Sequence, residues 1–211
     1  MDKRSTIILF LSFVAGLAIF GGTGCADDVL FSISYNTEEF EQNARPEIDI
    51  LWVVDNSRSM DRNQSGLGES FQSFINNLVE TGVDYHIGVI STDTLDGGML
   101  HTGANNVPYI QRDTIDPTGT FLQNVQVGVL GSATEKAFES AALTLGKGRS
   151  WQPGSTATPP NPGFLRTEAA LFLIMVSNED DKSFGPVDYY RKLFESYKGP
   201  GNENLISVSA I

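Results

Sequence analysis

Asp55, Ser57 and Ser59 carry oxygen-bearing side chains at alternate positions directly after an unbroken apolar run, residues 50–54. A short apolar run with β-branched residues predicts a strand that is buried on both faces. A loop that leaves such a strand can turn one carboxylate and two hydroxyl groups toward one point. Oxygen ligands suit hard cations such as Mg2+, which keeps several waters and takes few carboxylates. The spacing therefore predicts a cation site where this strand ends.

This Asp-x-Ser-x-Ser motif, behind a central strand and ahead of an amphipathic helix, resembles the metal-ion-dependent adhesion site of von Willebrand factor A domains. The resemblance extends over residues 47–211. It implies an α/β fold with a Rossmann-like, doubly wound, mostly parallel sheet and helices on both faces. It also implies that Ser57 and Ser59 touch Mg2+ (or Mn2+ or Ca2+) directly and that Asp55 acts mainly through bound water. An acidic side chain of a partner protein then completes the ligand shell.

In the family the third hydroxyl of this site belongs to a Thr that follows a Gly at a helix start, six residues before an apolar core position. That spacing selects Ser132, which follows Gly131. Thr134 has the matching residue type two positions later and is the alternative. Ser132 and Glu135 also have the spacing of a capping box, ahead of a helix over residues 137–145. Ser132 is therefore either a metal ligand or only the cap of this helix.

The resemblance places one more carboxylate at the end of a second buried strand, residues 169–177. The family has an Asp there, within a Thr-Asp-Gly sequence, whereas this chain has Asn178. An Asn side chain can hold a metal-bound water but brings no charge, so Asp180 is the alternative acidic ligand. The same acidic stretch also fits a helix cap ahead of Pro186.

A strand, a helix and a second strand position the motif. Apolar residues recur at helical spacing over residues 67–79 and predict an amphipathic helix of about four turns that ends at Gly82. Residues 85–91 predict the next strand, so the three elements form a right-handed parallel crossover unit. The carboxyl ends of both strands then open on one edge of the sheet, where ligands of open α/β sheets bind. Asp93 falls at this edge, either as a carboxylate that supports the site or as a turn residue.

The remaining elements have weaker patterns. Residues 94–128 predict an edge strand or hairpin within long loops, and residues 150–164, with four prolines, predict a surface loop. Pro186 at a first-turn position starts an amphipathic helix that ends near Gly199. Residues 205–211 predict a buried strand. The family continues beyond this point with a helix, a strand and a terminal helix, so the resemblance implies that the C-terminal part of the domain is missing.

The first 24 residues predict a secretory signal peptide, because a short basic start precedes a charge-free apolar run and a group of small residues. The chain's single cysteine, Cys25, follows directly, as in the lipobox of bacterial lipoproteins. The alternative is an ordinary cleaved signal with an incidental cysteine. Lipidation of Cys25 anchors a protein in a membrane, and Ala26, in place of an Asp, favours the outer membrane. Residues 25–46 are polar and acidic and predict a tether to the domain.

The charge balance argues against some partners. Asp2, Lys3 and Arg4 lie in the signal segment, so the 14 basic and 26 acidic residues of the chain fall to 12 and 25 in the mature protein. A net charge near −13 argues against nucleic acid as a partner. The length suits one domain with a sizeable core.

The motif and the resemblance together predict a non-enzymatic lipoprotein of the bacterial cell envelope that binds a protein partner through a divalent cation. One alternative is a structural module that keeps the fold without the cation, which the neutral Asn178 favours. A second is an enzyme of the phosphotransferase type, which also starts from an Asp at the end of a buried strand. Those enzymes carry an Asp-x-Asp motif whose second carboxylate is the acid/base group, whereas this chain has Ser57 at that position.

Overall fold

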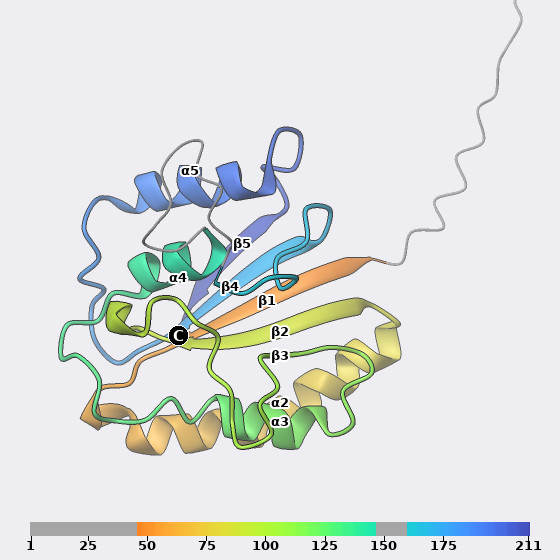
Figure 1. Cartoon of the computed structure of the whole chain (residues 1–211), viewed down its shortest axis with the longest axis horizontal. Helices are drawn as coiled ribbons and strands as arrows, with labels where there is room; N and C mark the ends of the chain where they lie inside the picture. Colours follow the sequence, from red (N-terminus) through yellow and green to blue (C-terminus); the bar gives the residue numbers. More distant parts are fainter. Residues whose placement is uncertain (1–45, 147–159) are drawn as a thin grey trace, which may run out of the picture. The chain divides into compact units, whose positions relative to one another are not determined.

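The computed structural model describes residues 46–146 and 160–211. Five strands form one sheet in the order β3-β2-β1-β4-β5 (Figure 1). The four longer strands run parallel, and β3 pairs antiparallel with β2. The strands are β1 Glu47–Val54, β2 Asp84–Ser91, β3 Tyr109–Ile110, β4 Ala170–Val176 and β5 Ile206–Ala210. The expected mostly parallel α/β sheet is confirmed.

β1 is the middle strand, and its apolar sequence follows from that position. It pairs with β2 from Glu47 to Val54 and with β4 from Ile48 to Val54. Leu51, Val53 and Val54 are completely buried, because elements pack against both faces of a central parallel strand.

Helices cover both faces of the sheet, as expected. α2 and α3 lie on one face, and α4 and α5 lie on the other (Figure 1). The helices are α2 Asp61–Thr81, α3 Pro117–Asn124, α4 Ala137–Leu145 and α5 Val187–Lys198, with short 3-10 turns η1 Arg58–Met60 and η2 Thr94–Asp96. α2 ends at Gly82, whose φ of 70° lies in the left-handed region that glycine adopts without strain.

Each face has its own hydrophobic core. On one side, Phe71 of α2 stacks on Phe121 of α3 with ring centroids 3.5 Å apart, and both belong to the core that includes Ile87 of β2. On the other side, Ala141 of α4 and Phe194 of α5 share a core with Leu173 of β4 and its neighbours. These cores hold β1 and β4 from both sides, so the loops that follow the two strands start at fixed points.

The stretch 94–128 contains a helix that the sequence pattern did not predict. α3 starts at Pro117, and the side chain of Asp116 caps it by accepting a hydrogen bond from the backbone N–H of Gly119 (2.9 Å). The Asp-Pro pair is a helix-start signal, but the helix has only eight residues and its Gly and Thr residues weaken the periodicity. The expected edge strand is present as the two-residue β3.

The capping box predicted at Ser132 and Glu135 is wrong. α4 begins at Ala137, and no side chain caps its first turn. Glu135 is instead 1% exposed, and its carboxylate accepts a hydrogen bond from the hydroxyl of Thr92. Glu135 therefore bonds to Thr92, a residue distant in the sequence, and does not cap the start of α4. Pro186 likewise precedes α5 at the N-cap position instead of standing in its first turn.

The strand predicted over residues 205–211 is present as β5, but it is largely exposed rather than buried. Val208 of β5 is 44% exposed, and Phe172 of the adjacent β4 is 39% exposed. β5 lies at an edge of the sheet, which explains why its neighbours shield it on one side only.

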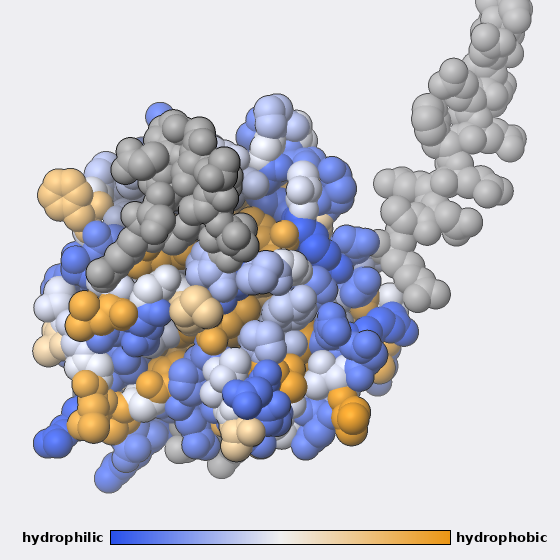
Figure 2. Space-filling view, viewed as in Figure 1, coloured by the Kyte–Doolittle hydropathy of each residue, from blue (hydrophilic) through white to orange (hydrophobic). Residues whose placement is uncertain are grey.

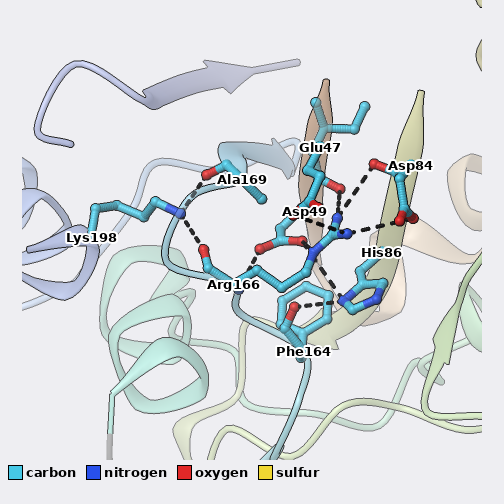
Figure 3. Close-up of polar contacts among 9 residues, drawn as sticks. Glu47, Asp49, Asp84, His86, Phe164, Arg166, Ala169 and Lys198 are labelled. Atoms are coloured by element: carbon cyan, nitrogen blue, oxygen red, sulfur yellow. Dashed lines mark hydrogen bonds and ion pairs between the residues drawn. The ribbon is translucent and has the colours of Figure 1, made fainter. Parts of the chain in front are cut away.

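A cluster of charged residues fastens the amino ends of β1 and β2 (Figure 3). Arg166 donates hydrogen bonds from its backbone N–H and its Nε to the carboxylate of buried Asp49 (2.7 and 2.8 Å). Its Nη1 lies 3.6 Å from Glu47 and 3.5 Å from Asp84. Burial raises the pKa of Asp49, and the hydrogen bonds and charge of Arg166 partly offset that effect. Buried Lys198, at the end of α5, donates to two backbone carbonyls, one of them that of Arg166.

Several predicted segments lie outside the described residues. They are the signal peptide over residues 1–24, the lipidation site Cys25, nearly all of the tether over residues 25–46, and most of the loop over residues 150–164. Within the two described ranges, none of the helices has the length and apolar character needed to cross a membrane.

Candidate metal site

The predicted site lies at the carboxyl ends of β1 and β4. The strand order reverses there, because β2 follows β1 on one side while β4 lies on the other. Open α/β sheets bind ligands at such switch points. The loop after β1 contributes Asp55, Ser57 and Ser59, and the loop after β4 contributes Asn178.

Asp55 is completely buried, and its carboxylate joins the two loops. Its Oδ1 accepts a hydrogen bond from the backbone N–H of Ser57 (2.7 Å), which turns the first loop back on itself. Its Oδ2 accepts a hydrogen bond from the hydroxyl of Ser177 at the end of β4 (2.7 Å). The backbone N–H of Asp55 donates to the carbonyl of Val176 (2.9 Å). The positions of the two loops therefore depend on each other.

The two hydroxyls of the motif lie against each other and reach Asn178. Ser57 Oγ and Ser59 Oγ are 3.0 Å apart, and Ser59 Oγ donates to Asn178 Oδ1 over 3.0 Å. We call Asp55, Ser57, Ser59 and Asn178 the oxygen group, since hydrogen bonds connect all four. Ser57 is buried, whereas Ser59 and Asn178 are exposed, so the oxygen group opens to solvent on one side.

The loop that carries Ser132 is attached beside the oxygen group. The backbone N–H of Gly131 donates to the carbonyl of Asn56 (3.1 Å), and the N–H of Ser132 donates to Asp93 Oδ2 (3.2 Å). The hydroxyl of Ser132 accepts a hydrogen bond from the N–H of Thr134 (3.0 Å). Across the described part of the chain, no hydrogen bond joins Ser132 or Thr134 to the two motif hydroxyls. The structure thus brings this loop to the site but does not link its hydroxyls to the group.

Asp93 and Asp180 differ in their relation to the site. Asp93 is a turn residue, as the second of its two predicted roles has it, since Oδ1 accepts a hydrogen bond from the N–H of Leu95 in the turn after β2 (2.8 Å). Its Oδ2 also accepts the hydrogen bond from the N–H of Ser132. The side chain of Asp180 is 97% exposed and lies 3.9 Å from the amino group of Lys182. Asn178, and not Asp180, therefore contacts the hydroxyls of the motif.

Gln64 of α2 supports the site and was missed by sequence reasoning. This buried side chain donates from Nε2 to the carbonyls of Asp55 (2.9 Å) and Gly128 (2.8 Å). It thereby ties the loop after β1 to the loop that leads to Ser132. The available signal was its position, three residues before Leu67, which places an amide on the inner side of an amphipathic helix.

Glu135 is the second residue that sequence reasoning missed. Its Oε2 accepts the hydrogen bond from Thr92, and its Oε1 is buried without a hydrogen-bond partner. Burial raises the pKa of Glu135 to about 6; the nearby Asp55 carboxylate adds to this shift, and the hydrogen bond from Thr92 opposes it. The amide oxygen of Asn56 is also buried and unpartnered. The sequence spacing of Glu135 pointed to a helix cap, so only the fold reveals its position.

The residues brought together fit a hard divalent cation. They offer carboxylate, hydroxyl and amide oxygens, the ligand types that such ions take. In the described ranges, no three His, Cys, Asp or Glu side chains form a metal-binding cluster. The oxygen group itself holds two hydroxyls and one amide beside a single carboxylate, and Mg2+ accepts few carboxylates and keeps several waters. The buried oxygens of Asn56 and Glu135 that have no hydrogen-bond partner are further candidate ligands for a cation.

The surface beside the site is hollowed and partly apolar. A cavity of about 720 Å3 lies between the loops after β2 and before α4, and Asn56 and Asp93 line it. Large apolar side chains of the same loops are exposed, namely Leu95, Met99 and Leu130. Figure 2 shows separate hydrophobic patches within a largely hydrophilic surface. This edge of the sheet could make apolar contacts with another molecule in addition to polar ones.

Comparisons with known proteins identify distant structural likenesses only. No family model matches the chain, and no curated protein matches it. Among solved structures it is similar to proximal thread matrix protein 1 from the mussel byssus, with 12% identity and a TM-score of 0.39 over 79% of this chain and 38% of that one. Another crystal form of that protein gives 10% identity and a TM-score of 0.38 over 79% and 37% of the two chains.

The chain is also similar to the pilus adhesin SpaC from Lactobacillus rhamnosus GG in its open conformation. The identity is 16% and the TM-score is 0.34, over 64% of this chain and 15% of that one. The chain thus spans less than two thirds of the length of each of these proteins. Likeness at this level carries no argument about function.

Proposed function

We propose that the described domain is a von Willebrand factor A-like module that binds a divalent cation and, through it, an acidic group of a partner protein. The observation that carries the proposal is the oxygen group, in which two loops 119 residues apart bring hydroxyl and amide oxygens into contact at the switch point of the sheet. Buried Asp55 supplies a negative charge at the same point.

Each residue has a distinct part in holding Mg2+ (or Mn2+ or Ca2+). Ser57 and Ser59 would present neighbouring hydroxyl oxygens to the ion. Asp55 would contribute charge and act through a bound water, because both of its oxygens already accept hydrogen bonds from the protein. Asn178 adds an amide oxygen, and Ser132, with Thr134 as the alternative, is the candidate third hydroxyl.

A cation held by few protein charges keeps its attraction for a carboxylate, so an acidic side chain of a protein is the natural ligand. The exposed apolar residues Leu95, Met99 and Leu130 would surround that contact and exclude water from it. The chain itself carries a formal net charge of −12, so nucleic acid does not fit as a partner. The proposal assigns no reaction to the site, since Ser57 stands where a phosphotransferase needs a carboxylate.

The sequence of the amino-terminal segment supports a location for this module. A signal peptide over residues 1–24, lipidation at Cys25 and a polar tether up to residue 46 would make the protein an outer-membrane lipoprotein of a bacterial cell envelope. The domain would then reach its partner from a membrane anchor.

Thermal or chemical unfolding in the presence of Mg2+ or Mn2+ tests the cation site. An ion that binds only the folded state stabilises it by about 2.7 kcal/mol at a hundredfold excess over the dissociation constant. The double variant Ser57→Ala/Ser59→Ala should lose this stabilisation and keep the fold of the metal-free protein. Ser73→Ala, on the exposed face of α2, is the matched control and should behave as wild type.

An unchanged unfolding midpoint of the wild-type protein at millimolar Mg2+ and Mn2+ would refute cation binding and leave the metal-free structural module. The partner contact is measured separately, by titrating the protein with a Glu-containing peptide. Binding should be present with Mg2+ and absent with EDTA.

A further inference from the structure

Glu135 has no part in the Asp-x-Ser-x-Ser motif, yet it lies at the same place. Its side chain is 1% exposed and accepts a hydrogen bond from Thr92, whose backbone N–H donates to the carbonyl of Val54, the residue before Asp55 (3.1 Å). One of its oxygens is held by Thr92 while Oε1 is buried and unpartnered. A buried oxygen that no protein group satisfies is uncommon and indicates a missing partner.

Two basic residues adjoin Glu135: Lys136 follows it in the sequence, and the backbone N–H of Lys182 bonds to its carbonyl, but the side chains of both lie against other carboxylates. Lys136 Nζ lies 2.7 Å from Glu139, and Lys182 Nζ lies 3.9 Å from Asp180. Two adjacent buried carboxylates repel each other, and burial makes the charged form of each more costly. A divalent cation bound at this place would offset both penalties, because it would supply the opposite charge and a partner for the unpartnered oxygen.

The backbone around Glu135 is held firmly enough to present this side chain. Its carbonyl accepts a hydrogen bond from the N–H of Lys182 (2.6 Å), and the N–H of Lys136 donates to the carbonyl of Thr92 (3.3 Å). The hydroxyl of the same Thr92 fixes Oε2. Thr92 is therefore a positioning residue: it holds Oε2 and leaves Oε1 available as a ligand for an ion.

We propose that Glu135 is an acidic ligand of the cation site and that it supplies, with Asp55, the second negative charge that the neutral Asn178 lacks. This inference rests on the proposed function of the site. It deepens that function by naming the residue that restores its charge, since affinity for hard divalent ions depends on the number of charged ligands.

Direct titration with Mn2+, followed by electron paramagnetic resonance of the free ion and by calorimetry, tests the assignment. Glu135→Gln removes the charge while keeping the shape and a hydrogen-bond partner for Thr92. It should weaken Mn2+ binding at least tenfold. Glu179→Gln is the matched control, because Glu179 is an exposed acidic residue next to Asn178. Its removal should change the affinity less than threefold.

A second variant separates loss of charge from damage to the fold. Asn178→Asp in the Glu135→Gln background returns one negative charge to the oxygen group and should restore most of the affinity. Wild-type binding by Glu135→Gln would overturn the role of Glu135 and leave the proposed function standing. Equal losses in Glu135→Gln and Glu179→Gln would also overturn it, because the effect would then be one of general charge. An absence of Mn2+ binding in the wild-type protein would refute the proposed function itself.

Discussion

Replacement of Gln64 by Met tests whether one side chain of α2 holds the two site loops together. Gln64 Nε2 donates to the carbonyls of Asp55 and Gly128 at 2.9 and 2.8 Å. Met has nearly the length and shape of Gln and a similar helix propensity. The substitution therefore removes two hydrogen bonds with little change in packing.

The magnitude follows from the two carbonyls that lose their donor. The carbonyl of Asp55 is buried, and a buried acceptor left without a partner costs about 1–3 kcal/mol. Gly128 is exposed, so water can replace the lost donor at its carbonyl. We expect the free energy of unfolding to fall by about 1–3 kcal/mol. For a domain of this size, that loss lowers the thermal midpoint by roughly 2–12 °C.

Urea unfolding of the metal-free protein, followed by tryptophan fluorescence and by circular dichroism, measures this change. Coincident transitions by the two probes establish that unfolding is two-state. Gln72→Met is the matched control on the same helix, since Gln72 is exposed and its side chain donates to that of Asn76, which is exposed too. Its free energy of unfolding should stay within about 0.5 kcal/mol of the wild-type value. If Gln64→Met were no less stable than Gln72→Met, the bracing role of Gln64 would be refuted.

Three further predictions concern other parts of the chain. Burial raises the pKa of Glu135 from 4.5 to about 6. The folded state therefore binds this proton more tightly than the unfolded state, so the metal-free protein should lose at most about 2 kcal/mol of stability as the pH rises from about 4.5 through 6. Urea unfolding measured against pH should show this loss in the wild-type protein and not in Glu135→Gln. Gly131→Ala places a Cβ 2.1 Å from side-chain atoms of Asn56, so it should displace this loop and weaken Mn2+ binding severalfold, whereas an unchanged titration would contradict the packing. Cys25→Ala should abolish incorporation of labelled fatty acid and release the protein from the membrane fraction, and equal labelling of both proteins would refute lipidation.

The parts of the fold that the sequence predicts well are those in which a local pattern and a tertiary role coincide. β1, β2 and β4 are apolar runs because they are buried between helices. α2 shows its apolar stripe because one side faces the sheet. The same reasoning failed for α3, whose eight residues carry little periodicity, and for β5, where an apolar run lies at an exposed edge of the sheet.

Some residues of the site can likewise be predicted from the sequence, and others cannot. Asp55, Ser57 and Ser59 are recognisable because their spacing along one loop is itself the signal. The contact between Ser59 and Asn178 depends on the pairing of β1 with β4, which no spacing encodes. Glu135 was assigned to a local cap because Ser132 precedes it by three residues. Its partner is instead Thr92, 43 residues away, and only the assembled sheet brings the two together.

The position of β1 determines how the domain would carry a mechanical load. The chain enters β1 at Glu47 and reaches Asp55 eight residues later, a distance of about 26 Å along one extended strand. A pull between the amino-terminal side of the domain and a ligand held at Asp55 therefore runs along this strand. To move β1 lengthwise, such a force must shear its ladders with β2 and β4 at the same time. The contacts of Arg166 with Glu47, Asp49 and Asp84 join the start of this strand to the start of β2, so they would have to break in the same movement.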